Sequence, residues 1–238
     1  MKILITNDDG IQSPALPLLA EWAKKLGDVT VAAPKVEQSG KSQAINFMHP
    51  VEIMQVDLVE GVSAYSVDSS PADCVRFGVL GLNQTYDLII SGINRGYNLG
   101  DDIVYSGTCG AIFEGSRLGI NGLALSTDPD NLLEAPKVLD AVWEYVQKND
   151  LYAHNNLYNI NIPPMPDGFR ITKQGGMFFK DTFIHHEGML FVQSGEILKD
   201  CGSDPTTDIN TVRAGKISVC PLIATRTEMS VYEKLKNI

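Results

Sequence analysis

Short apolar runs alternate with amphipathic stretches through the first 130 residues of the chain. The apolar runs are bounded by Gly, Pro, Asn or Asp, and their length is typical of buried strands. We expect five such strands, at residues 2–6, 29–33, 51–56, 87–91 and 123–126.

Helices are predicted between these runs. Apolar residues recur at helical spacing over residues 14–26. Ser70-Pro71 places a capping residue and a proline where a helix favours them, and further helices are expected after Ser106 and over about 133–148. This alternation predicts an α/β fold: a doubly wound, mostly parallel, Rossmann-like sheet between two helical layers.

The pattern changes after residue 150. Residues 158–162 alternate as a strand does, and residues 169–220 hold short β-like runs separated by Gly and Asp, which favours hairpins. A short helix is expected at about 228–236. We interpret the chain as one domain, 1–238, with a C-terminal β-hairpin extension at about 165–220. Hairpins this small need cover from the main sheet or from another chain, so the extension is a candidate oligomerisation element.

Composition narrows the class of protein. The net charge is −10 without a basic cluster, which argues against a binder of duplex nucleic acid. No apolar run is long enough to span a bilayer, and the N-terminus enters a strand without a signal-peptide core. We therefore expect a cytoplasmic protein without membrane contact. The four cysteines are widely scattered, as reduced structural thiols would be.

Asp8 and Asp9 directly follow the first predicted strand. A parallel strand delivers the residues after it to the carboxyl edge of the sheet, where open α/β folds bind ligands. Adjacent carboxylates there repel each other unless a positive charge lies between them, and hard divalent cations prefer oxygen ligands. The alternative is an acidic turn that caps a helix.

Two more polar loops follow predicted strands. One contains Ser39-Gly40-Lys41-Ser42, and the other runs from Gly92 to Asn98. Two carboxylates, a serine hydroxyl and an asparagine carbonyl would give four oxygen ligands with little charge. Such a set suits Mg²⁺ or Mn²⁺ with water positions left open.

The segment Tyr105-Ser106-Gly107-Thr108-Cys109-Gly110 opens a predicted helix with small residues. Backbone N–H groups at a helix N-terminus, together with the helix dipole, favour a phosphate group. The alternative is a plain N-cap with close helix packing. A metal site beside this turn would favour the phosphate interpretation.

Other chemistries fit less well. Gly40-Lys41-Ser42 lacks the earlier glycine of a P-loop, and neither G-x-G-x-x-G nor G-x-S-x-G is present. Asp8-Asp9-Gly10 departs from the D-x-D of haloacid-dehalogenase-like phosphatases, which nevertheless remain an alternative class. A Mg²⁺-binding receiver-like regulatory module is a second alternative, although the chain is about twice as long and lacks a clear phosphoacceptor aspartate.

Four motifs together resemble the SurE family of metal-dependent nucleotidases. They occur in the order of that family over residues 1–126. They are Ile5-Thr6-Asn7-Asp8-Asp9-Gly10-Ile11, Ser70-Pro71-Ala72-Asp73-Cys74-Val75, Ser91-Gly92-Ile93-Asn94-Arg95-Gly96-Tyr97-Asn98 and Tyr105-Ser106-Gly107-Thr108. Two positions depart from the family pattern: Ser69 replaces a usual Gly, and Thr225 stands where Asp is frequent.

The resemblance implies a role for particular residues. One divalent metal ion per chain, Mg²⁺ or Mn²⁺, would bind Asp8, Asp9, Ser39 and Asn94. Phosphate would contact Asn98, Ser106, Gly107 and Thr108, and the catalytic set would be Asp8, Asp9, Asn98, Ser106 and Thr108.

The resemblance also implies the reaction and the assembly. The expected activity is hydrolysis of nucleoside 5′-monophosphates to nucleoside and phosphate, with 3′-nucleotides and short polyphosphate as further candidate substrates. The expected assembly is a homodimer or homotetramer formed through the C-terminal third.

Overall fold

A computed structural model describes residues 1–238, and it contains a nine-stranded sheet in the order β3-β4-β2-β1-β5-β6-β7-β11-β8. The strands from β4 to β7 run parallel to one another, whereas β3 and β11 pair antiparallel with β4 and β7. The sheet strands are β1 (Lys2–Thr6), β2 (Asp28–Pro34), β3 (Ile53–Val56), β4 (Ser63–Val67), β5 (Leu88–Arg95), β6 (Asn121–Thr127), β7 (Leu157–Ile162), β8 (Phe169–Ile171) and β11 (Ile217–Pro221). The predicted mostly parallel α/β sheet is confirmed.

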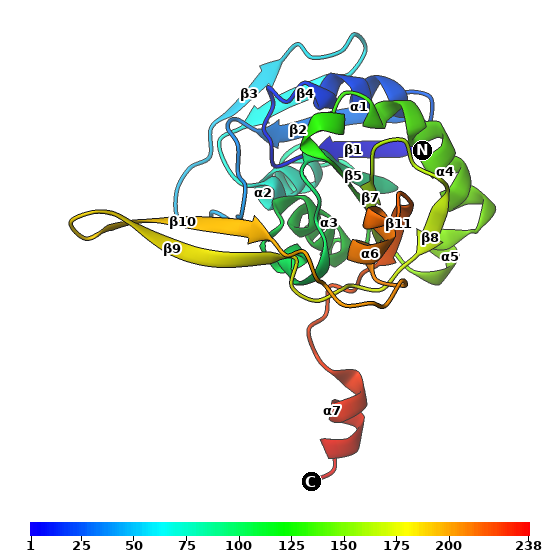
Figure 1. Ribbon diagram of the computed structural model, residues 1–238. Helices are drawn as coiled ribbons and strands as arrows, with labels where there is room; N and C mark the ends of the chain where they lie inside the picture. The colour runs from blue at the N-terminus through cyan, green and yellow to red at the C-terminus, as the bar shows by residue number, and fades with distance from the viewer.

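Helices cover both faces of this sheet (Figure 1). The helices are α1 (Ala15–Ala23), α2 (Pro71–Arg76), α3 (Gly107–Arg117), α4 (Leu139–Lys148), α5 (Leu151–His154), α6 (Asp208–Arg213) and α7 (Met229–Leu235). The four helix starts or spans expected from sequence before residue 150 correspond to α1, α2, α3 and α4. None of the helices is both long and apolar enough to cross a membrane.

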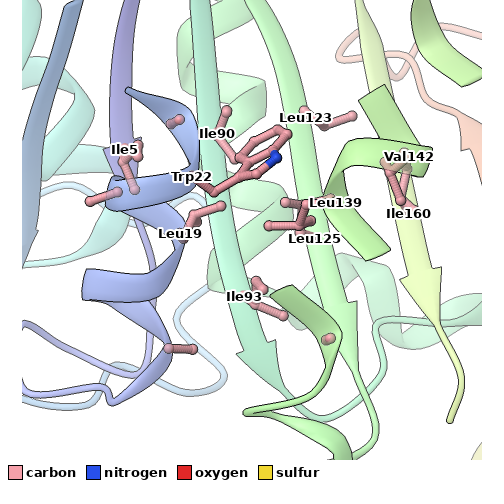
Figure 2. Packing of buried hydrophobic residues seen from close by; sticks show 14 of the residues in the cluster. Ile5, Leu19, Trp22, Ile90, Ile93, Leu123, Leu125, Leu139, Val142 and Ile160 are labelled. Carbon is pink, nitrogen blue, oxygen red and sulfur yellow. The ribbon is translucent and has the colours of Figure 1, made fainter. Parts of the chain in front are cut away.

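Alternation along β1 divides the core in two. Ile3 and Ile5 belong to the cluster beneath α1 and α4, whereas Leu4 belongs to the cluster beneath α2 and α3. Figure 2 shows the first cluster, where Trp22 of α1 and Leu139 of α4 lie over the central strands. Successive side chains of a strand point to opposite faces, so one apolar run supplies both layers. Each fully buried Leu or Ile side chain contributes about 1.5–3 kcal/mol.

The C-terminal third differs in detail from the expectation. It contains one hairpin, β9 (Phe179–Glu187) and β10 (Leu190–Ile197), which forms its own two-stranded sheet and projects from the body (Figure 1). The neighbouring strands β8 and β11 join the main sheet instead. Strand β4 and helix α6 were not expected from sequence. The predicted C-terminal helix is α7, which extends away from the body with no buried residue.

The cysteines are unpaired, as expected for reduced thiols. Cys74, Cys109 and Cys220 are buried among apolar residues. Burial raises the pKa of the Cys109 and Cys220 thiols to about 12, so neither is ionised at neutral pH.

Candidate active site at the carboxyl edge of the sheet

Hydrogen bonds join the polar loops of this edge to Asp8 and Asp9. The amide of Gln38, in the loop after β2, donates to the Asp8 carbonyl at 2.7 Å. The amide of Arg95, at the end of β5, donates to Asp9 Oδ2 at 3.0 Å. The Thr108 hydroxyl, in the first turn of α3, donates to Asp8 Oδ1 at 2.7 Å. Segments far apart in sequence therefore meet at the aspartate pair, as the topology predicts.

Asn7 fixes the turn that presents the two aspartates, a role that sequence reasoning missed. Its side-chain amide donates to the Gly10 carbonyl at 3.0 Å, and its Oδ1 accepts from the Gly10 amide at 3.1 Å. Gly10 has φ +95°, a conformation that glycine adopts readily. The available signal was an asparagine placed after an apolar strand and shortly before a glycine, a position typical of a turn in which its side chain bonds the backbone.

The positive charge near Asp8 and Asp9 is too small to offset the burial of their carboxylates. Burial raises the pKa of Asp8 to about 6, while the hydrogen bond from Thr108 partly offsets the rise. Burial also raises the pKa of Asp9, with a further contribution from Glu37 that the Arg95 amide and charge oppose. None of the protein's ion pairs includes Asp8 or Asp9. A bound cation would supply the missing charge, so these residues fit a metal.

The other two candidate ligands lie in the adjoining loops. Ser39 is exposed and lines a cleft of about 530 Å³ together with Asp9 and Arg95. Its hydroxyl donates to Glu37 Oε1 at 2.7 Å. The Asn94 amide donates to the Gly96 carbonyl at 2.8 Å, while its Oδ1 accepts no hydrogen bond within the protein. That carbonyl oxygen thus keeps its capacity to bind a metal.

The candidate metal ligands carry little negative charge. The protein contains no cluster of three or more His, Cys, Asp or Glu side chains suited to a metal. A site at this edge therefore depends on two carboxylates and on neutral oxygens. Such a combination suits a hard divalent cation that retains several water ligands.

Helix α3 begins directly beside Asp8. Ser106 is its N-cap, because the Ser106 Oγ accepts from the Cys109 amide at 3.0 Å. Thr108 is buried and its hydroxyl is directed to Asp8. A Cβ at Gly107 would lie 2.9 Å from the Asp8 Cβ, so glycine permits the close approach. The capping role of Ser106 is thus observed, and the same turn faces the aspartate pair.

Asn98 is held by a buried amide network that the sequence did not reveal. Its side-chain amide donates to Ser126 Oγ at 2.8 Å, and its backbone amide donates to Asn161 Oδ1 at 2.9 Å. Its carbonyl accepts from the amides of Asn159 and Asn161 at 2.8 and 3.0 Å. Asn98 forms no hydrogen bond with Ser106, Gly107 or Thr108. It lies at the same edge of the sheet, on the side of β6 and β7.

The loop that carries Ser39 is fastened to α3 and to the segment directly before it. Its Ser42 amide donates to the Tyr105 carbonyl at 2.9 Å. The Gln43 side chain donates to Glu114 Oε2 at 2.9 Å, and Glu114 also pairs with Arg76 and Arg117. These contacts place residue 39 next to the aspartates although the loop has no regular structure.

Gly110→Ala is expected to displace this loop and weaken metal binding. A Cβ at position 110 would lie 2.1 Å from the Ser42 carbonyl oxygen, so the backbone of the loop must move. Alanine favours a helix over glycine by about 1 kcal/mol, so α3 itself should not be weakened. We expect the affinity for Mn²⁺ to fall about tenfold, as for loss of an outer-shell support, with faster hydrogen exchange in residues 35–46.

Gly176→Ala is the matched control, because a Cβ there meets nothing within 4 Å. It should leave both the Mn²⁺ affinity and the exchange of residues 35–46 unchanged. Unchanged values in Gly110→Ala as well would show that the loop does not need its contact with α3.

Comparison with known proteins identifies the family. The sequence model described as "Survival protein SurE" matches residues 3–181. The chain belongs to the SurE family. The 5′-nucleotidase SurE of Caldanaerobacter subterraneus subsp. tengcongensis is 34% identical over 246 residues, which cover 99% of this chain and 96% of that protein. The Legionella pneumophila (strain Philadelphia 1) 5′-nucleotidase SurE is 33% identical over 250 residues, covering 100% and 97%.

A solved structure of a SurE protein has the same fold as this chain. The crystal structure of the SurE protein from Aquifex aeolicus has a TM-score of 0.82 and 31% sequence identity to this chain. The similarity covers 100% of this chain and 99% of that one. The family resemblance inferred from the four motifs is therefore confirmed, together with the α/β fold.

Proposed function

We propose that the protein is a divalent-metal-dependent phosphatase that hydrolyses nucleoside 5′-monophosphates to nucleoside and phosphate. The observation that carries the proposal is the junction of Asp8 and Asp9 with the N-terminus of α3. It joins two carboxylates without a paired cation to a helix start that can accept an anion. The names of the SurE relatives in two organisms support the same activity.

The metal would be held by Asp8, Asp9, Ser39 and Asn94, and Mg²⁺ or Mn²⁺ matches their oxygen chemistry. When bound, such an ion polarises a phosphate oxygen and makes a water molecule more acidic. Asp8 and Asp9 keep the charge that attracts it only when ionised, and burial opposes that ionisation.

The remaining residues bind the phosphate and orient it. Gly107 exposes the start of α3, and the Ser106 and Thr108 hydroxyls and the Asn98 amide are the candidate donors to phosphate oxygens. The Thr108 hydroxyl has one hydrogen, which it donates to Asp8 here, so it would donate to phosphate by exchanging that bond. Donors aimed at charge that develops in the transition state accelerate a reaction more than donors that bind the substrate equally. Asp8 or Asp9 would accept the proton of the attacking water.

Phosphate release from AMP, GMP, CMP, UMP, 3′-AMP and short polyphosphate tests the proposal, each with Mn²⁺, Mg²⁺ or EDTA. We expect repeated turnover of the 5′-monophosphates that requires metal. Uptake of a single phosphoryl group per chain would instead indicate a receiver-like module. A trapped aspartyl-phosphate intermediate would indicate chemistry of the haloacid-dehalogenase type.

A homodimer or homotetramer is expected through the C-terminal third. Both faces of the projecting hairpin carry exposed apolar side chains, and an apolar surface of this kind marks an interaction site. These side chains are Phe183, Ile184, Met189, Leu190, Phe191, Val192 and Ile197. Helix α7 adds exposed apolar residues away from the body. We expect light scattering at micromolar concentration to give at least twice the 26.0 kDa mass of one chain.

Substitutions on one face of the hairpin localise the contact. Ile184 and Val192 are a cross-strand pair. Replacing both with serine should lower the mass of the assembly measured by light scattering. Phe47 lies outside the hairpin and its side chain is 80% exposed, so Phe47→Ser should leave that mass unchanged. A wild-type mass near one chain that metal does not alter would contradict the prediction.

A further inference from the structure

A second opening lies beside the start of α3. It is a cavity of about 430 Å³, within the range of roughly 300–1,000 Å³ that small-molecule pockets occupy. Tyr105 directly precedes the phosphate turn, and Gly40 directly follows Ser39, so the inner wall belongs to two of the candidate site loops. The lining residues are Gly40, Asp102, Tyr105, Phe179, Asp181 and Gln193.

The outer wall of this cavity is the root of the β9–β10 hairpin. Phe179 and Asp181 are two residues apart on β9 and therefore share a face. Gly195 pairs with Asp181 across the hairpin, and a Cβ there would lie 2.9 Å from Asp181 Oδ1. Glycine thus leaves room for the carboxylate on the face that lines the cavity.

Phe179 is fixed in place by its neighbour. Its ring meets that of Phe178 edge to face, with centroids 4.9 Å apart. Phe178 is buried against Leu99, Ile209 and Val212. The hairpin root is therefore anchored to the body, and its aromatic wall is already formed.

The chemistry of the lining suits the uncharged part of a nucleotide. Tyr105 is 60% exposed, so its ring is accessible, and aromatic rings stack on bases of any kind. Asp102 and Asp181 both line the cavity, and a carboxylate oxygen exposed there can accept hydrogen bonds. Two carboxylates repel phosphate but accept hydrogen bonds from hydroxyl and amino groups. The cleft beside Asp9 has only one hydrophobic lining residue and contains no aromatic ring.

We propose that this cavity is the nucleoside subsite, in which Tyr105 and Phe179 flank the base and Asp102 and Asp181 accept hydrogen bonds from the ribose hydroxyls. The inference rests on the proposed function and extends it to the part of the substrate that distinguishes a nucleotide from other phosphate esters. It also implies that monophosphates are favoured, because a longer phosphate chain would bring negative charge towards the two carboxylates.

Steady-state kinetics with AMP and glycerol 3-phosphate test the subsite in the full-length, metal-loaded enzyme. Tyr105→Ala should raise KM for AMP about tenfold, since loss of one stacked base typically weakens binding by this order. It should leave kcat for AMP within about twofold and kcat/KM for glycerol 3-phosphate unchanged. Tyr105→Phe keeps the ring and should restore KM.

A hairpin variant tests the ribose contact without altering the phosphate turn. Asp181→Ala, which removes both acceptor oxygens, should reduce the preference of the enzyme for AMP over 2′,3′-dideoxy-AMP, with the melting temperature unchanged. Gln12→Ala tests the alternative that the nucleoside binds in the cleft beside Asp9. It should leave KM for AMP unchanged.

The outcomes separate the two proposals. If wild-type enzyme hydrolyses AMP but Tyr105→Ala and Asp181→Ala leave its KM unchanged, the subsite is wrong and the function stands. A rise in KM with Gln12→Ala alone would place the nucleoside in the other cleft. An equal loss with AMP and glycerol 3-phosphate in Tyr105→Ala would show that Tyr105 acts only through the phosphate turn. No turnover of AMP by wild type would overturn both proposals.

Discussion

Asp9→Asn is expected to abolish metal-dependent phosphate release while the fold is kept. Asparagine retains an acceptor for the Arg95 amide, which donates to Asp9 Oδ2 at 3.0 Å, so the local turn should persist. What is lost is one of two carboxylate charges that form no ion pair, since the Arg95 charge offsets that of Asp9 only in part. Because loss of even an outer-shell support costs about 10- to 100-fold in metal affinity or activity, we expect at least about 100-fold lower activity at saturating AMP.

Thermal unfolding with and without Mn²⁺ distinguishes lost metal binding from lost structure. Metal should raise the melting temperature of wild type but not that of Asp9→Asn, because a ligand stabilises only the state that binds it. Without metal the variant should be as stable as wild type or slightly more so, since the carboxylates repel each other. Asp28→Asn, at an exposed position at the start of β2, is the matched control. Wild-type turnover and Mn²⁺ stabilisation in Asp9→Asn would refute the metal assignment.

Thr108→Val is expected to reduce kcat/KM on the order of 100-fold, the typical cost of removing one donor aimed at transition-state charge. The valine keeps the shape of the buried side chain but removes the hydroxyl that donates to Asp8 Oδ1. An unpaired buried polar group costs about 1–3 kcal/mol of stability, so some loss of stability should accompany the kinetic effect. Thr108→Ser restores the hydroxyl and should recover activity to within a few-fold.

The pH profile separates a chemical role of Thr108 from a structural one. Burial raises the pKa of Asp8, and the Thr108 hydroxyl opposes this rise because it stabilises the ionised carboxylate. The resulting pKa of Asp8 is about 6. Removal of the hydroxyl should therefore raise the pKa of Asp8 further in the metal-free protein, and the acidic limb of Mn²⁺ binding should move to higher pH. An unmoved limb, with activity within a few-fold of wild type and a lower melting temperature, would mean that Thr108 only supports the helix.

Much of the fold was predictable because its signals are local. The first strand, the capped starts of α2 and α3, and the glycine turns are each encoded within a few residues. Strand β4 was missed because Ser63-Ala64-Tyr65-Ser66-Val67 contains little apolar surface. Its structure comes from pairing with β2 and β3, which lie elsewhere in the sequence.

The candidate site shows the same division. Asp8, Asp9 and the turn at Ser106 could be found from their positions after a strand and before a helix. The network around Asn98 could not, because Asn159 and Asn161 look like ordinary alternating positions of a strand. Only the packing of β7 inside the sheet shows that both are fully buried and turned towards Asn98. Likewise, nothing local in sequence connects Gln43 with Glu114.

The partners of Asn98 lie far enough along the chain that the candidate site is completed late in synthesis. All of the candidate ligands and phosphate contacts lie at or before Thr108, so they leave the ribosome first. The asparagines that hold the Asn98 carbonyl follow it by 61 and 63 residues. A nascent chain thus carries Asn98 for some time before it gains the strand that holds this residue, and the candidate site is complete only after β7 has joined the sheet.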